Sequence, residues 1–259
     1  MEIDLGQNHI SNLNIANIHH LFHIPPFNNP ILLPSPLFPY LYSMQRIPKT
    51  ISLSFILLLS MALSPCFAQK VEIKAIIDSD LLQQGDSLLK AGQYKDAIDK
   101  YTTVINLSPG KALAYAKRGF AQLDQDKYKA ALADFNKAIA LDSMDCVTWS
   151  NRGLTKWYLN DYKGAVSDCE KSKHLCPFYS FAYFHEGMAR YMLNENENAI
   201  ILYDKAIELD STMYRAWFNR GLIKIDKKDF NGACIDLHKA KELGSTKADK
   251  LITEHCEKK

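Results

Sequence analysis

The residues of this chain best suited to metal binding or nucleophilic catalysis are its six cysteines and eight histidines. A zinc site needs such ligands at short, paired spacings, and a nucleophile needs a base held beside it. The sequence has no CxxC pair, no Cys/His pair at zinc-ligand spacing, and no fixed offset between histidines and a serine or cysteine. It also lacks a glycine-rich phosphate loop and the HExxH and GxSxG motifs. We therefore expect no metal, no cofactor and no enzymatic activity.

The charge balance limits the class of partner. The chain has 31 Lys and Arg against 29 Asp and Glu, a formal net charge of +2. Nucleic-acid binding depends on a clustered basic excess, which a nearly neutral chain does not provide. Hydrophobic residues make up 47% of the chain, within the range of folded globular proteins. The composition thus favours a folded protein whose partner is not a nucleic acid.

The N-terminal part of the chain differs from the rest. Residues 1–43 contain no Lys or Arg, and six prolines between positions 25 and 39 prevent a regular element. We predict that these residues are disordered or a misassigned upstream extension, and that translation begins at Met44.

Residues 44–68 have the layout of a secretory signal peptide. Arg46 and Lys49 precede an apolar run at 51–63, and small residues stand at positions −3 and −1 if cleavage follows Ala68. This predicts export to the periplasm or cell envelope. The alternative is an uncleaved N-terminal membrane anchor, although the run is short for a membrane span.

The same segment gives two weaker indications. Pro65 stands before Cys66, where a lipoprotein signal has a small residue, so lipidation is disfavoured. The Phe67-Ala68-Gln69 sequence after the apolar run resembles signal peptides of exported Bacteroidetes proteins.

Three columns of residues recur with a period of 34, without one insertion. They are Gly at 85, 119, 153, 187 and 221, Ala at 97, 131, 165, 199 and 233, and Leu at 107, 141, 175, 209 and 243. The repeats in this frame are 78–111, 112–145, 146–179, 180–213 and 214–247. The period and columns closely resemble the tetratricopeptide repeat.

The resemblance implies an all-α fold, an α-solenoid of five helix-turn-helix repeats. Small residues at positions 8, 20 and 27 of each repeat allow two antiparallel helices to approach closely, and large residues at positions 4 and 24 fill the adjacent space. We predict helices at 79–91, 94–107, 112–125, 128–141, 146–159, 162–174, 180–193, 196–209, 214–227, 230–243 and 246–257. Residues 69–77 are a lead-in, and 248–259 form the capping helix that a solenoid end requires.

The chain departs from the family at positions 7 and 11 of the repeat. These positions carry charged or polar residues where Leu and Tyr are typical, for example Arg118, Arg152 and Arg220 at position 7. We expect these changes to alter surface chemistry and to leave the helical hairpin intact.

In this family, first helices line a concave groove with positions 2, 5, 6, 9, 12 and 13. Transferred to repeats three to five, these positions give an aromatic and methionine-rich surface, as partner sites often are. The predicted partner-binding residues are Asn151, Trp157, Tyr158, Phe181, Phe184, His185, Tyr191, Met192, Arg215, Phe218 and Asn219. Among these, Trp157, Tyr158, Phe184 and His185 are expected to touch a ligand. Leu154, Met188 and Leu222 are expected to be buried, and the alternative for each residue is packing between repeats.

Some cytosolic members clamp the C-terminal carboxylate of heat-shock chaperones with Lys, Asn and Arg at defined groove positions. In repeats one to four, only Asn151 matches that pattern. The resemblance therefore implies a non-catalytic scaffold or adaptor that binds a different peptide or protein in the envelope. The alternative is a fixed structural subunit of a larger membrane-associated complex, which also uses the convex face.

Two cysteines are candidates for a disulfide in an oxidising compartment. Cys234 lies ten residues before Gly244, and Cys256 lies eleven after Ser245. If the last repeat helix and the capping helix run antiparallel about this turn, the two thiols stand at nearly the same height. The alternative is that Cys234 is a small buried hydrophobic residue. Cys169 and Cys176, seven residues apart on one helix, are too far apart to bridge each other.

Overall fold

The computed structural model describes the backbone of residues 53–257 and the side chains of residues 72–257. The predicted upstream extension and the first part of the predicted signal peptide, residues 1–52, lie outside the described residues. Two compact units divide the chain, Met1–Pro65 and Cys66–Lys259, and all five repeats belong to the second. No helix among the residues with described side chains is long and apolar enough to cross a membrane.

Every regular element between residues 53 and 257 is a helix, which confirms the predicted all-α fold. The helices are α3 (Leu53–Lys90), α4 (Tyr94–Leu107), α5 (Ala112–Leu123), α6 (Tyr128–Leu141), α7 (Cys146–Tyr158), α8 (Tyr162–Leu175), α9 (Ser180–Met192), α10 (Asn196–Leu209), α11 (Tyr214–Asp226), α12 (Phe230–Glu242) and α13 (Ala248–His255). The predicted lead-in, 69–77, is helical and belongs to α3. From α4 onward, each helix starts within two residues of its predicted position.

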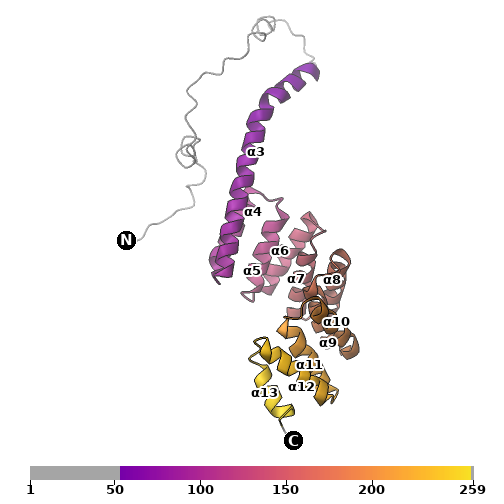
Figure 1. The fold of residues 1–259 in the computed structure, drawn as a ribbon. Helices are drawn as coiled ribbons and strands as arrows, with labels where there is room; N and C mark the ends of the chain where they lie inside the picture. The colour runs from indigo at the N-terminus through magenta and orange to yellow at the C-terminus, as the bar shows by residue number, and fades with distance from the viewer. Residues whose placement is uncertain (1–52, 258–259) are drawn as a thin grey trace, which may run out of the picture. The chain divides into compact units, whose positions relative to one another are not determined.

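The helices pack as a continuous stack of hairpins (Figure 1). Each helix from α4 onward contacts the next in sequence, and the first helices of neighbouring repeats also touch, as α7 and α9 do. The glycine column lies where the two helices of one hairpin meet. A Cβ atom on Gly153 would stand 2.8 Å from the sulfur of Cys169 and 3.1 Å from the carbonyl oxygen of Ala165. Close approach of the helices therefore requires glycine at this position.

The turn inside each hairpin places position 15 in the left-handed region. The residues there are Gly92 (φ 73°), Asp126 (58°), Asn160 (63°), Asn194 (62°) and Lys228 (63°). Glycine adopts this conformation freely and Asn and Asp tolerate it, but lysine does so at a cost. The five turns thus share one backbone geometry, although the residue at position 15 varies.

The charged residues at position 7 leave the helical hairpins intact, as expected, but the expectation that they alter surface chemistry was wrong. Arg152 of α7 forms two hydrogen bonds of 2.7 Å with Asp168 of α8, whose side chain is 4% exposed. Arg118 with Asp134, and Arg220 with Asp236, form the same bidentate pair. A third guanidinium nitrogen reaches the preceding repeat, where Arg152 donates to Asn136. Polar bonds therefore connect the two helices of a hairpin and adjacent hairpins.

Repeat four has a carboxylate at position 7 in place of the guanidinium group. Glu186 occupies position 7, is 2% exposed, and forms salt bridges with Lys173 of repeat three and Arg190 of its own helix. Arg at position 7 occurs with Asp at position 23 in repeats two, three and five, and neither occurs in repeats one and four. This joint occurrence within one sequence is the signal that could have predicted the pairing.

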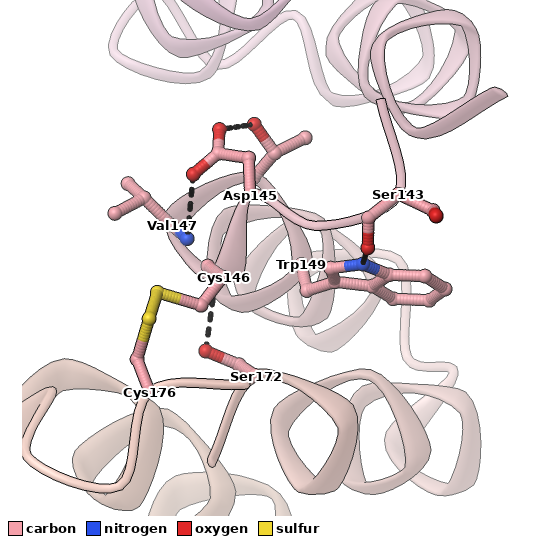
Figure 2. The surroundings of a disulfide bond; sticks show 8 residues. Ser143, Asp145, Cys146, Val147, Trp149, Ser172 and Cys176 are labelled. Atoms are coloured by element: carbon pink, nitrogen blue, oxygen red, sulfur yellow. Dashed lines mark hydrogen bonds between the residues drawn. A yellow bond between two sulfur atoms is a disulfide. The ribbon is translucent and has the colours of Figure 1, made fainter. Parts of the chain in front are cut away.

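A disulfide between Cys146 and Cys176 joins the start of the third repeat to its end (Figure 2). Their Cα atoms lie 6.0 Å apart, and the Ser172 hydroxyl donates to the Cys146 carbonyl oxygen at 2.7 Å. The side chain of Asp145 caps α7 by accepting from the Val147 amide. We did not predict this bridge. The repeat frame contains the signal, because positions 1 and 31 of an antiparallel hairpin lie at the same end.

The capping helix α13 packs on α12 through Leu237, Ala240, Ala248 and Ile252, all nearly or fully buried. Cys234 and Cys256 are joined by a disulfide, with their Cα atoms 5.7 Å apart. This distance lies within the 7 Å limit for a bridge. The last helix is thus attached by apolar packing and by one covalent bond. Cys169, in contrast, has a free and buried thiol.

Candidate functional site

First helices of three consecutive repeats form a pocket of about 400 Å³ together with the turn before α13. We call it the concave pocket. It is lined by Leu154, Tyr158, Phe184, His185, Met188, Tyr214, Arg215, Phe218, Asn219, Gly244, Ser245, Thr246 and Lys247. All helical members come from α7, α9 and α11, the face that the repeat resemblance assigns to ligands. A volume of this size accommodates a small ligand or a few side chains.

The lining divides by chemistry along the pocket. α7 contributes only Leu154 and Tyr158, and α9 contributes Phe184, His185 and Met188. The α11 side contributes Tyr214, Arg215, Phe218 and Asn219, and the turn beyond α12 contributes Lys247. The α7 end of the concave pocket is therefore apolar and aromatic, whereas the α11 end combines two aromatic rings with the two cationic groups of the lining.

Arg215 differs from the other arginines that the structure describes. Arg118, Arg152, Arg190 and Arg220 each lie within 3.1 Å of a carboxylate oxygen. Arg215 is exposed, and no carboxylate in residues 72–257 lies within the 4.0 Å of an ion pair. Its Nε donates to the Tyr214 hydroxyl at 3.3 Å, which holds the guanidinium beside that ring. An arginine in this state is available to an anionic group.

Two predicted ligand contacts, Phe184 and His185, line the concave pocket but are nearly buried. Phe184 is 4% exposed and packs against Tyr203, with ring centroids 5.9 Å apart. His185 is 6% exposed, and its Nδ1 lies 2.9 Å from the Ser150 hydroxyl. Burial lowers the pKa of His185 to about 4, against the opposing effect of the Ser150 hydrogen bond. Both side chains form the floor of the concave pocket because adjacent first helices pack closely there.

The other expected contacts lie in different surroundings. Tyr158 is 43% exposed and stacks on Tyr128 of the preceding repeat, with ring centroids 4.5 Å apart. Trp157 is half-buried, and its indole nitrogen donates to the Met188 carbonyl oxygen at 3.3 Å. Tyr158 is thus an accessible aromatic residue, whereas Trp157 links two repeats.

The structure brings together six of the eleven predicted residues and leaves five outside the concave pocket. The six are Tyr158, Phe184, His185, Arg215, Phe218 and Asn219. The five that do not line it are Asn151, Trp157, Phe181, Tyr191 and Met192. Phe181 and Met192 are exposed, and the Tyr191 hydroxyl donates to Asp226 at 2.9 Å.

Leu154, Met188 and Leu222, which were expected to be buried between helices, are half-buried. Leu154 and Met188 line the concave pocket. Sequence reasoning missed Tyr214 and the turn residues 244–247, which belong to no groove position of the repeat. The superhelical stacking brings them there, and a single-repeat pattern does not describe contacts between repeats.

Among residues 72–257, no group of three or more His, Cys, Asp or Glu side chains is placed to hold a metal ion. The lining of the concave pocket contains one histidine, which is buried and bonded to a serine. The chemistry that this arrangement offers is noncovalent binding by apolar contact, one guanidinium and one ammonium group.

Comparison with known proteins supports the repeat assignment. Family models of the TPR repeat and the tetratricopeptide repeat match residues 85–126, and 112–143 and 182–213, respectively. No curated protein sequence matches the chain significantly.

Among solved structures, the chain is similar to MamA from Desulfovibrio magneticus RS-1, with 20% identity, a TM-score of 0.56, and coverage of 64% of this chain and 94% of that one. It is also similar to PilF of Pseudomonas aeruginosa (16% identity, TM-score 0.62, coverage 70% and 86%). A third is YrrB, described as a TPR protein with an unusual peptide-binding site (19% identity, TM-score 0.52, coverage 67% and 90%). At these identities the similarity shows the fold. With the family-model matches, the 34-residue columns and the stacked hairpins, it shows that the chain contains tetratricopeptide repeats arranged as an α-solenoid.

Proposed function

We propose that this protein is a non-catalytic interaction scaffold of the cell envelope that binds a peptide segment of a partner protein in the concave pocket. The observation that carries the proposal is the pocket itself, formed by three consecutive first helices. It combines an exposed tyrosine, Tyr158, with an arginine that lacks an ion-pair partner in the described part of the chain. Side chains of this kind are enriched where proteins recognise other proteins.

Similar proteins provide further support. Proteins with this fold include YrrB, whose structure is described as having a peptide-binding site.

The envelope location is proposed from two observations. Residues 44–68 have the pattern of a signal peptide, and two disulfides join four of the cysteines that follow it. Structural disulfides persist in oxidising compartments such as the periplasm and are rare in the cytosol.

Site-specific photocrosslinking in cells tests the binding surface. A photoreactive phenylalanine analogue at position 158 should yield discrete crosslinked partners in the envelope fraction. The comparison site is Ile235 on the second helix α12, which is 68% exposed and lies outside the concave pocket. Crosslinks at 235 with none at 158 would contradict binding in the concave pocket.

A second candidate, a fixed structural subunit of a larger envelope complex, is favoured by one specific observation. Ile201 and Ile235 occupy the same position of repeats four and five and are 64% and 68% exposed. Large apolar side chains at corresponding outer positions are typical of interaction surfaces. Under this alternative, position 235 should crosslink to a stoichiometric partner, and the protein should migrate with a large assembly in size-exclusion chromatography of solubilised envelopes.

A further inference from the structure

We infer that the concave pocket selects an internal acidic peptide segment, in which a large apolar side chain stands within a few residues of an Asp or Glu that binds Arg215. This inference depends on the proposed function and names the chemical class of the ligand. It assigns the apolar residue to the end lined by Leu154, Tyr158 and Met188 and the carboxylate to the end lined by Arg215 and Lys247.

The state of Arg215 indicates an anionic ligand. Its Nε is bonded to the Tyr214 hydroxyl, and its two terminal nitrogens have no hydrogen-bond partner among residues 72–257. Two adjacent guanidinium nitrogens match the two oxygens of a carboxylate and bind it in a fork geometry. Because the neighbouring tyrosine fixes the guanidinium, less side-chain freedom is lost when a carboxylate binds.

The positive charge of Arg215 affects the pKa of two groups, His185 and Asp124. His185 is neutral at physiological pH because burial lowers its pKa to about 4, and Arg215 contributes in the same direction. Burial raises the pKa of Asp124 at the end of α5, and Arg215 opposes that rise. Asp124 lies beyond ion-pair distance, so it does not neutralise the guanidinium by direct contact. Lys247, which also forms no ion pair in the described chain, adds a second positive charge at this end.

The apolar end of the concave pocket favours an apolar side chain of the ligand over a charged one. Leu154 and Met188 are half-buried, and Tyr158 presents an accessible ring. Desolvation of a carboxylate against these residues is unfavourable, whereas an aromatic or long aliphatic side chain gains by burial there. About 400 Å³ leaves room for only a few side chains, so the two preferences apply to residues close together in the ligand sequence.

One observation favours an internal segment over a free C-terminus. Both ends of the concave pocket are lined by exposed residues, Tyr158 at one and Lys247 at the other. A chain can therefore enter and leave the pocket.

Selection from a random heptapeptide library, displayed with fixed flanking residues on both sides, tests this inference. The protein is purified from cells that express the full sequence. The expected result is enrichment of peptides with Phe, Tyr, Trp, Leu or Met within about two residues of an Asp or Glu, on either side. Arg215→Glu should reverse the preference from acidic to basic residues. Arg215→Gln should weaken binding of a selected peptide roughly 10- to 100-fold, the range for loss of a charged hydrogen-bonding partner.

Lys171→Glu provides the matched control, since Lys171 is exposed on α8, outside the concave pocket, and the substitution changes the net charge equally. It should leave selection unchanged, and circular dichroism should show equal helicity for all variants. Selected peptides without acidic enrichment, or an unchanged preference with Arg215→Glu, would overturn this inference but leave peptide binding intact. Binding only to peptides with a free C-terminal carboxylate would also overturn it. A failure to select any peptide would contradict both this inference and the proposed function.

Discussion

Arg152 and Asp168 share two hydrogen bonds of 2.7 Å between the two helices of the third repeat. Lys156 also contacts Asp168 at 2.8 Å, and the Arg152 guanidinium lies 4.6 Å from the centre of the Trp149 ring. A buried carboxylate therefore connects both helices of the hairpin in the middle of the solenoid.

Removal of one partner of the Arg152–Asp168 pair should lower the free energy of unfolding strongly. Removal of the second partner as well should lower it little further. Arg152→Leu leaves the buried Asp168 with one remaining cation, and the expected loss is about 3 kcal/mol. In Arg152→Leu/Asp168→Leu no buried carboxylate is left uncompensated, so the double variant should be less destabilised than the sum of the single variants. Urea denaturation in a double-mutant cycle measures the coupling. Additive effects would show that the pair contributes no interaction energy.

Replacement of glycine by alanine at position 8 should have different effects on stability in different repeats. Gly153→Ala places a Cβ 2.8 Å from the Cys169 sulfur and 3.1 Å from a backbone oxygen, and should cost about 1–3 kcal/mol. At Gly221 the nearest atoms would be 3.3 Å away. There the gain in helix propensity, about 0.5–1 kcal/mol, should offset the tighter contact. Thermal unfolding of the two variants checks the difference, and equal melting temperatures would contradict this account.

Replacement of Lys228 by glycine should stabilise the turn between α11 and α12. Lys228 has φ 63°, a left-handed conformation that costs a residue with a Cβ roughly 1 kcal/mol. Lys228→Gly should therefore raise stability by up to about 1 kcal/mol, after subtraction of the greater freedom of glycine in the unfolded chain. The converse control is Gly92→Ala at the same position of repeat one, where no atom lies within 4 Å of the added Cβ. It should lower stability for conformational reasons alone, and opposite signs in denaturant midpoints are the expected result.

Acid should destabilise the fourth repeat through His185. Its pKa is about 4 in the folded protein because of burial, and about 6.5 in the unfolded chain. Below pH 6.5 the unfolded state binds the proton more readily, so stability is full above this value and falls as the pH drops towards 4. The loss is on the order of 3 kcal/mol. His185→Gln should flatten the dependence of unfolding free energy on pH between about 7.5 and 4.5, and an unchanged slope would exclude His185 as its origin.

Mass spectrometry of the non-reduced protein should show two crosslinks, Cys146–Cys176 and Cys234–Cys256. The Cys169 thiol, which is buried and whose pKa is raised by burial, should react with alkylating reagents only after unfolding. Each bridge should stabilise the protein by about 3 kcal/mol, as estimated for loops of 22 and 30 residues. Cys256→Ser should increase hydrogen exchange in α13 more than elsewhere. Free thiols at all four positions in protein from an oxidising compartment would refute the pairing.

The sequence by itself determined the elements of this protein. Gly, Ala and Leu recur every 34 residues because each hairpin faces the same local requirements, namely close helix approach, a tight turn and a filled interface. A column of five identical residues predicts helix boundaries within two residues from α4 onward. The resemblance to the tetratricopeptide repeat also assigned a groove to the first helices, and α7, α9 and α11 line the concave pocket.

Only the tertiary structure decided which groove residues are accessible. Phe184 and Tyr158 both follow from groove positions, yet one is 4% and the other 43% exposed. Their exposure depends on how closely neighbouring first helices pack, and that distance is set by side chains of different repeats. The contributions of Tyr214 and Lys247 to the concave pocket have the same origin. Repeat periodicity describes what each hairpin shares, whereas a binding site arises from the unequal side chains that stacking brings together.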